Sequence, residues 1–198
     1  MRFDRGSLRD ELSRMPTRNR AAFAACCAQR MIPNYERFQA LSGWGDPSVL
    51  RRALDYPWGI LSSDAATDRA GLKRHEAACD TVTPDMDDFG RFDFASAALD
   101  AAVAALGTLR CLETGEVDPA IDAATAARDS VDMHVQELEG LEPEDADLEA
   151  RIVAHPLYQR EMQHQERILA HLTGAPALTP EIVNQLREET LRAAGLPG

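Results

Sequence analysis

The sequence predicts an all-α protein: a compact up-and-down bundle of about seven or eight helices with no sheet, folded as one domain over residues 1–198. Three observations support this fold class. Ala, the best helix former, occupies 32 of the 198 positions, and β-branched residues are sparse. Apolar residues recur with helical spacing over long segments. An Asp or Thr followed by Pro, which is typical of a helix start, occurs four times.

The N-terminal part is predicted to form a short amphipathic helix at about 4–14 and a long helix at 18–41. The apolar stripe of the long helix consists of Phe23, Cys27, Met31, Phe38 and Leu41. Pro33 should break or bend this helix, because Pro lacks the N–H of a helix hydrogen bond and its ring clashes with the preceding turn. Gly43 ends the helix, since glycine readily adopts the left-handed conformation found there.

In the middle of the chain, Asp46 caps a predicted helix at 47–62, and another helix follows at 67–79. The connection at 80–92 is acidic and irregular. An Ala-rich helix at 93–113 carries a face of small residues, which lets neighbouring helices approach closely. This face consists of Ala98, Ala102 and Ala105.

The remaining helices are predicted at 119–139, 144–154, 156–173 and 180–194. Asp118 and Thr179 cap the first and the last of them, and each is followed by Pro. His155-Pro156 separates the middle two. The connections are short, so neighbouring helices should pack antiparallel.

The net charge of −12 argues against nucleic acid and anionic membranes as partners, because polyanions are repelled. Residues 1–60 hold ten Arg against six Asp and Glu, whereas 61–198 hold eleven Lys and Arg against twenty-seven. The acidic part could attract a basic partner or simply keep the protein soluble. We find no apolar run close to the ~20 residues that span a bilayer and no signal peptide. A cytoplasmic location is therefore expected.

The Arg-rich start of the chain could contact phosphate, but Asp and Glu alternate with the Arg residues. We interpret it as a solvated face, with Asp10 and Arg14 forming a pair one turn apart. The cysteines are Cys26, Cys27, Cys79 and Cys111. None forms a C-x-x-C motif, and we expect four free, reduced thiols, with Cys26 and Cys27 buried.

Glu161 and His164 form a Glu-x-x-His pair, a spacing that binds metal in two-metal helical bundles. Helical periodicity places both on an inward stripe with Leu157 and Ile168. A two-metal site needs a second such pair, and the remaining histidines do not supply one. We therefore predict no metal and no cofactor, and interpret Glu161 and His164 as a partly buried polar pair between helices. Known nucleophile and phosphate-binding motifs are absent from the sequence.

A second candidate site lies at 30–58, where Arg and aromatic residues gather around Pro33. The candidate residues are Arg30, Asn34, Tyr35, Trp44, Arg52 and Trp58. Such a group could build a ligand pocket or a partner-binding surface. Alternatively it is an aromatic corner in which Arg52 pairs with Asp46 or Asp55. In either case Tyr35 is expected to turn toward the helix at 47–62 and bond to a charged side chain there or to Arg30.

The same block carries a resemblance to a known family. The matching residues are Arg30, Met31, Pro33, Asn34, Tyr35, Phe38, Gly43-Trp44-Gly45-Asp46, Arg51, Arg52 and Trp58, followed by Asp87-Asp88-Phe89 and Asp100-Ala101. This pattern resembles the YjaG-like family of bacterial proteins (domain of unknown function 416). The resemblance covers roughly 20–116 and is weaker beyond 140. It implies a compact helical bundle in the bacterial cytoplasm, and no activity.

Two functional interpretations remain open. The first is a non-enzymatic helical-bundle protein that binds an unknown protein partner or forms a homo-oligomer. The second is a ligand-binding protein or a metal-dependent enzyme with a pocket near Pro33 or at Glu161 and His164. A concave pocket with converging polar groups would favour the second interpretation, and a flat apolar patch the first.

Overall fold

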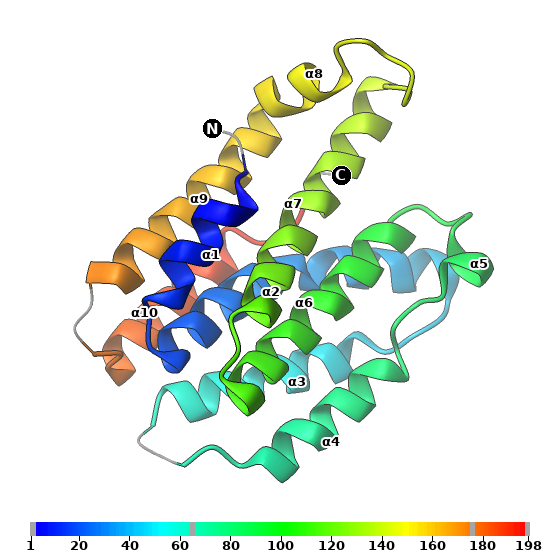
Figure 1. Cartoon of the computed structure of the whole chain (residues 1–198). Coiled ribbons are helices and arrows are strands. Elements are labelled where there is room, and N and C mark those ends of the chain that lie inside the picture. The colour runs from blue at the N-terminus through cyan, green and yellow to red at the C-terminus, as the bar shows by residue number, and fades with distance from the viewer. Residues whose placement is uncertain (1–2, 64–65, 175–176, 197–198) are drawn as a thin grey trace.

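The computed structural model describes residues 3–63, 66–174 and 177–196, and over these ranges the chain is helical with no strand (Figure 1). The helices are α1 (Arg5–Ser13), α2 (Thr17–Ser42), α3 (Pro47–Leu61), α4 (Arg69–Asp80), α5 (Met86–Phe89), α6 (Ala95–Thr114), α7 (Asp118–Glu139), α8 (Leu148–Ala154), α9 (Pro156–Gly174) and α10 (Pro180–Arg192). The all-α fold class is confirmed.

The described residues contain ten helices, more than the seven or eight expected. Nine of them correspond to the individual ranges predicted above, and the tenth is α5, a four-residue helix inside the connection predicted to be irregular. The side chains of Asp46 and Thr179 cap α3 and α10 as predicted, by accepting hydrogen bonds from backbone N–H groups. The predicted cap at Asp118 is wrong. Asp118 is the first residue of α7, and its carboxylate instead pairs with Arg9.

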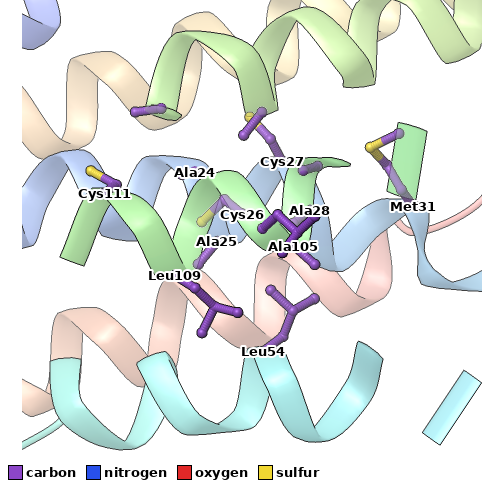
Figure 2. Packing of buried hydrophobic residues seen from close by; sticks show 14 of the residues in the cluster. Ala24, Ala25, Cys26, Cys27, Ala28, Met31, Leu54, Ala105, Leu109 and Cys111 are labelled. Atoms are coloured by element: carbon purple, nitrogen blue, oxygen red, sulfur yellow. The ribbon is translucent and has the colours of Figure 1, made fainter. Parts of the chain in front are cut away.

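Helix α6 lies at the centre of the bundle and packs most extensively against α2 and α7. The small-residue face predicted for it is fully buried. Figure 2 shows Ala105 and Leu109 of α6 beside Ala25 and Ala28 of α2. Contact with α7 is equally close, because a Cβ atom placed on Gly107 would lie 2.5 Å from the carbonyl oxygen of Pro119. Small side chains therefore set the distance between the central helices.

The expectation that no apolar segment is long enough to span a bilayer is wrong for α6. By length and composition Ala95–Thr114 would suffice, because its alanines make a helix interrupted by few charges. In the structure 72% of its most apolar window is buried inside the bundle. It is thus the core helix of this fold.

Helix α2 runs without a break through Pro33, so the predicted break is wrong, and a bend there stays a prediction. One Pro removes a single backbone hydrogen bond, and the burial of most of α2 offsets that loss. Sixteen of its 26 residues are buried. Tertiary packing has overridden the local preference of Pro.

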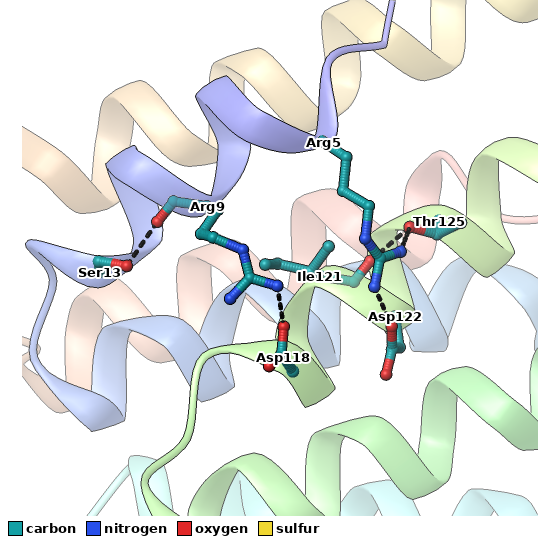
Figure 3. A network of polar contacts seen from close by, with 7 residues as sticks. All are labelled: Arg5, Arg9, Ser13, Asp118, Ile121, Asp122 and Thr125. Atoms are coloured by element: carbon teal, nitrogen blue, oxygen red, sulfur yellow. Dashed lines mark hydrogen bonds and ion pairs between the residues drawn. The ribbon is translucent and has the colours of Figure 1, made fainter.

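The Arg side chains of α1 attach this helix to α7 (Figure 3). Arg5 donates to Thr125 Oγ1 at 3.0 Å and to Asp122 Oδ1 at 2.7 Å, and Arg9 pairs with Asp118. These pairs are about half exposed, as expected of a solvated face. Their partners lie on another helix, however, and the expected Asp10 pair is not among the ion pairs of the described residues.

All four cysteines are buried free thiols, which confirms the prediction. Burial raises the pKa of Cys26 and of Cys111 to about 11, and that of Cys79 to about 12. The pKa of Cys27 is raised for the same reason. At neutral pH these thiols stay protonated, so they behave as small apolar side chains.

The buried apolar residues form two clusters. The larger fills the space between α1, α2, α3, α4, α6, α7, α9 and α10. The smaller joins α6, α7, α8, the start of α9 and Leu196, near the end of the described chain. Met31 belongs to the larger cluster, whereas Val131 and Leu196 belong to the smaller. The candidate site described next lies at this boundary.

Candidate functional site

A buried ion pair joins α2 to α9. Arg30 Nη1 donates to Glu161 Oε2 at 2.5 Å, and Nη2 donates to Oε1 at 2.6 Å. Both side chains are only 7% exposed. Burial by itself would lower the pKa of Arg30, but the Glu161 carboxylate more than compensates and raises it above its ordinary value. The pair is therefore a fixed element of the site, in which Arg30 keeps its charge.

Further polar contacts complete this pair. Gln165, one turn beyond Glu161, donates from Nε2 to Glu161 Oε1 at 2.8 Å and to the carbonyl of Ala124 on α7 at 3.0 Å. Arg30 Nε donates to the carbonyl of Cys26 at 3.3 Å. The network thus links α2, α7 and α9 through buried groups.

Glu161 is poorly placed to bind metal, because both carboxylate oxygens accept hydrogen bonds from Arg30. Within the described ranges, no group of three His, Cys, Asp or Glu side chains is arranged to hold a metal ion. That Glu161 and His164 bind no metal stays a prediction, and the ion pair gives it a physical reason.

A polar cavity of about 40 Å³ lies beside the ion pair. Its lining residues are Arg30, Met31, Asn34, Ala127, Ser130, Val131, Leu157, Arg160, Glu161, His164, Ala193, Gly195 and Leu196. At roughly 10–15 Å³ per water, it has room for about three water molecules. Ser130 on α7 is 3% exposed, and its hydroxyl has no hydrogen-bond partner among the described residues.

His164 lies at the edge of this cavity, half-buried. Burial is the main cause that lowers its pKa to about 4, and the positive charge of Arg30 lowers it further. Arg167 and Arg160 act in the same direction, whereas Glu161 opposes them. At neutral pH the imidazole is therefore uncharged, with one nitrogen that donates a hydrogen bond and one that accepts.

The C-terminal segment closes the cavity over α2. The N–H of Gly195 donates to the carbonyl of Arg30 at 2.8 Å, and the N–H of Leu196 donates to Asn34 Oδ1 at 3.0 Å. Gly195 has a φ of 86°, and a Cβ there would lie 3.3 Å from Pro33. Gly195 thus lies close against Pro33, and the two backbone bonds hold the C-terminal segment on α2.

A larger cleft of about 390 Å³ opens between α9 and α10. It is lined by His164, Arg167, Ile168, His171, Leu186, Glu189, Thr190, Arg192 and Ala193. These two helices are consecutive but pack mainly on other helices, α10 on α2 and α3 and α9 on α7 and α2. His164 and Ala193 line both the cavity and the cleft, so the two spaces adjoin.

The two candidate sites predicted from sequence meet in this region, since Arg30 and Asn34 lie with Glu161 and His164 around one cavity. The other candidates lie elsewhere. Tyr35 is fully buried and donates to the carbonyl of Val82 at 2.6 Å, so the charged partner expected for it is wrong.

The remaining candidates, Trp58, Trp44 and Arg52, make contacts of other kinds. Trp58 is buried and donates from Nε1 to Gln29 Oε1 at 3.2 Å. Trp44 packs against Phe89 with ring centroids 4.6 Å apart. Arg52 is exposed, and its guanidinium lies 4.0 Å from Asp46, the first of the two partners considered. These contacts fit the aromatic-corner interpretation.

Sequence reasoning missed Ser130 and the C-terminal segment. A signal for Ser130 was present, because it continues the buried stripe of Ala123 and Ala127 at helical spacing. No local pattern indicates that Gly195 docks on α2, since the two segments are far apart in the chain.

The fold and the site define an all-α bundle built around a buried ion pair and an adjoining polar cavity. The sequence model of the family described as "Protein of unknown function (DUF416)" matches residues 7–196, and the chain belongs to this family. The resemblance seen in the sequence is thereby confirmed, and it extends beyond the 20–116 range to nearly the whole chain.

Two bacterial relatives carry the name "Uncharacterized protein YjaG", one from Escherichia coli K12 and one from Salmonella typhimurium LT2. Each is 29% identical over 187 residues, which covers 93% of this chain and 90% of the relative. The crystal structure of a DUF416 family protein from Shewanella baltica OS155 superposes with a TM-score of 0.83 at 24% identity, covering 93% of each chain. This structural similarity confirms the fold, and none of the printed names assigns an activity.

Proposed function

We propose that this protein is a non-enzymatic, cytoplasmic binding protein for a small polar molecule that enters the α9/α10 cleft and reaches the cavity at His164. The observation that carries the proposal is the buried Ser130 hydroxyl, which has no partner in the described structure and lines that cavity. A buried polar group without a hydrogen bond costs about 1–3 kcal/mol, so an occupant of the cavity is expected.

The sizes of the two spaces support this arrangement. The cavity alone holds only water, whereas the cleft lies within the roughly 300–1,000 Å³ of small-molecule sites. Ile168 and Leu186 supply apolar walls to the cleft. The body of the ligand would occupy the cleft, and a polar group would pass His164 toward Ser130.

Binding is favoured over catalysis because the charged groups at the base of the site are already engaged. Arg30 and Glu161 neutralise each other, and the neighbouring Cys27 thiol is protonated. The Ser130 hydroxyl has no hydrogen-bond partner among the described residues, so no base is bonded to it in the way that activates a nucleophile. His164 supplies a neutral donor and acceptor, which suits recognition of a polar group.

Native mass spectrometry of the purified protein, together with elemental analysis, tests this proposal. We expect a mass excess that denaturation releases as a metal-free small molecule. Ala193→Phe should abolish it, because Ala193 lines both spaces. Ala150→Phe, at an exposed position of α8, is the matched control and should retain it. If the wild-type protein shows no mass excess and a metabolite library causes no thermal shift, the proposal is wrong.

A second candidate is association with a protein partner or a second copy. Met86 and Met133 are 37% and 42% exposed and line a groove with Phe92 and Phe94. Phe94 has a φ of 63°, which is rare for a bulky residue and typical of functional positions. The same mass spectra report the oligomeric state, and a monomer that carries a small molecule would leave ligand binding as the better proposal.

A further inference from the structure

The α9 wall of the site is positively charged, although the whole protein has a net charge of −12. Arg160 lines the cavity and Arg167 lines the cleft, with His164 between them. These residues follow each other at i, i+4 and i+7, and so share one face of α9. Neither Arg160 nor Arg167 has an ion-pair or hydrogen-bond partner in the part of the chain that the structure describes.

The other charges that line the cleft lie on α10. Arg192 donates to Glu188 Oε2 at 2.9 Å, whereas Glu189 accepts from the neutral amide of Gln185 at 2.8 Å and keeps its negative charge on the α10 side. Arg30 is neutralised by Glu161 deeper in the site. The uncompensated positive charge therefore belongs to α9.

We propose that the ligand carries an anionic oxygen group, a carboxylate or a phosphate, which binds between Arg160 and Arg167 and accepts a hydrogen bond from His164. This inference rests on the proposed function of the same site. Two guanidinium groups whose Cα atoms are about 10 Å apart can converge on one anion, because Arg side chains are long and donate in a fork. Charge-assisted bonds of this kind are stronger than those between neutral groups.

The body of the ligand would then lie against the apolar side chains of the cleft. Ile168 of α9 and Leu186 of α10 line the cleft, and both are anchored in the apolar core. A free inorganic ion would use only the charged end of the site, whereas an organic acid or a phosphate ester would also bury apolar surface. The site should therefore bind an organic anion more tightly than the corresponding inorganic or small anion.

NMR titration of the histidine ring signals tests the inference directly, with the His164 signal assigned from the spectrum of His164→Gln. The probes are inorganic phosphate, acetate and hexanoate, each added in exchange for chloride at constant ionic strength. We expect saturable shifts of the His164 signal and a higher pKa for this imidazole when an anion is bound, because a nearby negative charge favours its protonated form. Comparing phosphate with acetate identifies the preferred oxygen group, and hexanoate should bind more tightly than acetate.

Matched variants distinguish a specific anion-binding site from nonspecific electrostatic attraction of anions to the protein. Arg160→Gln and Arg167→Gln should each weaken binding of the best probe about tenfold, which corresponds to about 1.4 kcal/mol. Arg69→Gln removes an exposed Arg of α4 without a partner among the described residues, and it should have no effect.

Two results would overturn the inference. One is the absence of a saturable shift for every probe in the wild-type protein. The other is unchanged affinity in both Arg160→Gln and Arg167→Gln. If a neutral molecule copurifies and is retained by Arg167→Gln, the anionic ligand is wrong while the binding function stands. If neither a copurified molecule nor any probe binds, both proposals fail.

Discussion

The Arg30–Glu161 pair shows how one buried contact holds distant helices together. Removing two charges from water costs several kcal/mol each, and their attraction offsets this cost only when the geometry is good and the remaining groups are hydrogen-bonded. Here two parallel bonds join the side chains, and Gln165 also donates to Glu161 Oε1. The pair is therefore sensitive to loss of either partner.

Glu161→Gln should destabilise the protein by about 3–5 kcal/mol, because it leaves the Arg30 guanidinium buried without a counter-charge. Urea unfolding at pH 7, followed by circular dichroism, measures the change. Glu166→Gln, on the exposed face of the same helix, is the control and should change stability by less than about 0.5 kcal/mol. The double variant Arg30→Met with Glu161→Leu should recover much of the loss. A Glu161→Gln protein as stable as the control would contradict the importance of the pair.

At this scale the sequence could indicate part of the site. Helical spacing placed Glu161 and His164 on an inward face, and Glu161 is indeed buried. It could not indicate the partner, because Arg30 is 131 residues away and any of the many Arg residues could have paired with Glu161. A charged residue does not indicate which distant residue it will pair with, whereas apolar periodicity indicates which face of a helix is buried.

At the scale of the element, helix ends were predicted well where a neighbouring residue in the sequence caps the helix. Asp46 and Gly43 fixed neighbouring boundaries through local bonds, and both lie at the predicted positions. Pro33 failed as a signal because its local cost competes with burial along the whole of α2. The contact between α6 and α7 likewise depends on tertiary structure, and it centres on one glycine.

Gly107→Ala should destabilise the protein by about 1–3 kcal/mol, because its Cβ would meet the Pro119 carbonyl at 2.5 Å and push α7 away from α6. Ala normally stabilises a helix relative to Gly, so the direction is informative. The control is Gly59→Ala in α3, where no atom lies within 4 Å of the new Cβ, and a gain of about 0.5–1 kcal/mol is expected. Thermal unfolding of both variants checks this prediction, and a stabilised Gly107→Ala protein would refute it.

At the scale of the whole molecule, the free energy of unfolding depends on pH through carboxyl groups that are partly buried between helices. Burial raises the pKa of Asp100 on α6 to about 7, with the negative charge of Asp129 acting in the same direction and Arg128 opposing it. The folded state thus holds a proton that the unfolded chain releases near pH 4. Stability due to Asp100 is therefore full below about pH 4 and is lost as the pH rises toward 7.

Asp100→Asn should make the protein more stable than the wild type at pH 8, by on the order of 1–3 kcal/mol, and the advantage should disappear near pH 4. Urea midpoints of both proteins between pH 4 and 8 measure this difference. The effect of His164, whose lowered pKa destabilises the fold as the pH falls below about 6.5, is common to both proteins and cancels. A constant difference across this pH range would show that Asp100 does not titrate as described.

The docking of Gly195 and Leu196 on α2 also bears on how tightly any ligand can bind. The contact joins positions 162 residues apart, and Gly195 and Leu196 belong to the cavity lining, so the lining is complete only when the C-terminal segment is seated. Apparent affinity then equals the intrinsic affinity multiplied by the seated fraction, and a segment seated half of the time would double the dissociation constant. Hydrogen exchange at the Leu196 amide, which Asn34 protects, reports that fraction directly. If the proposed binding function holds, the seating of Gly195 and Leu196 would set the fraction of molecules able to bind.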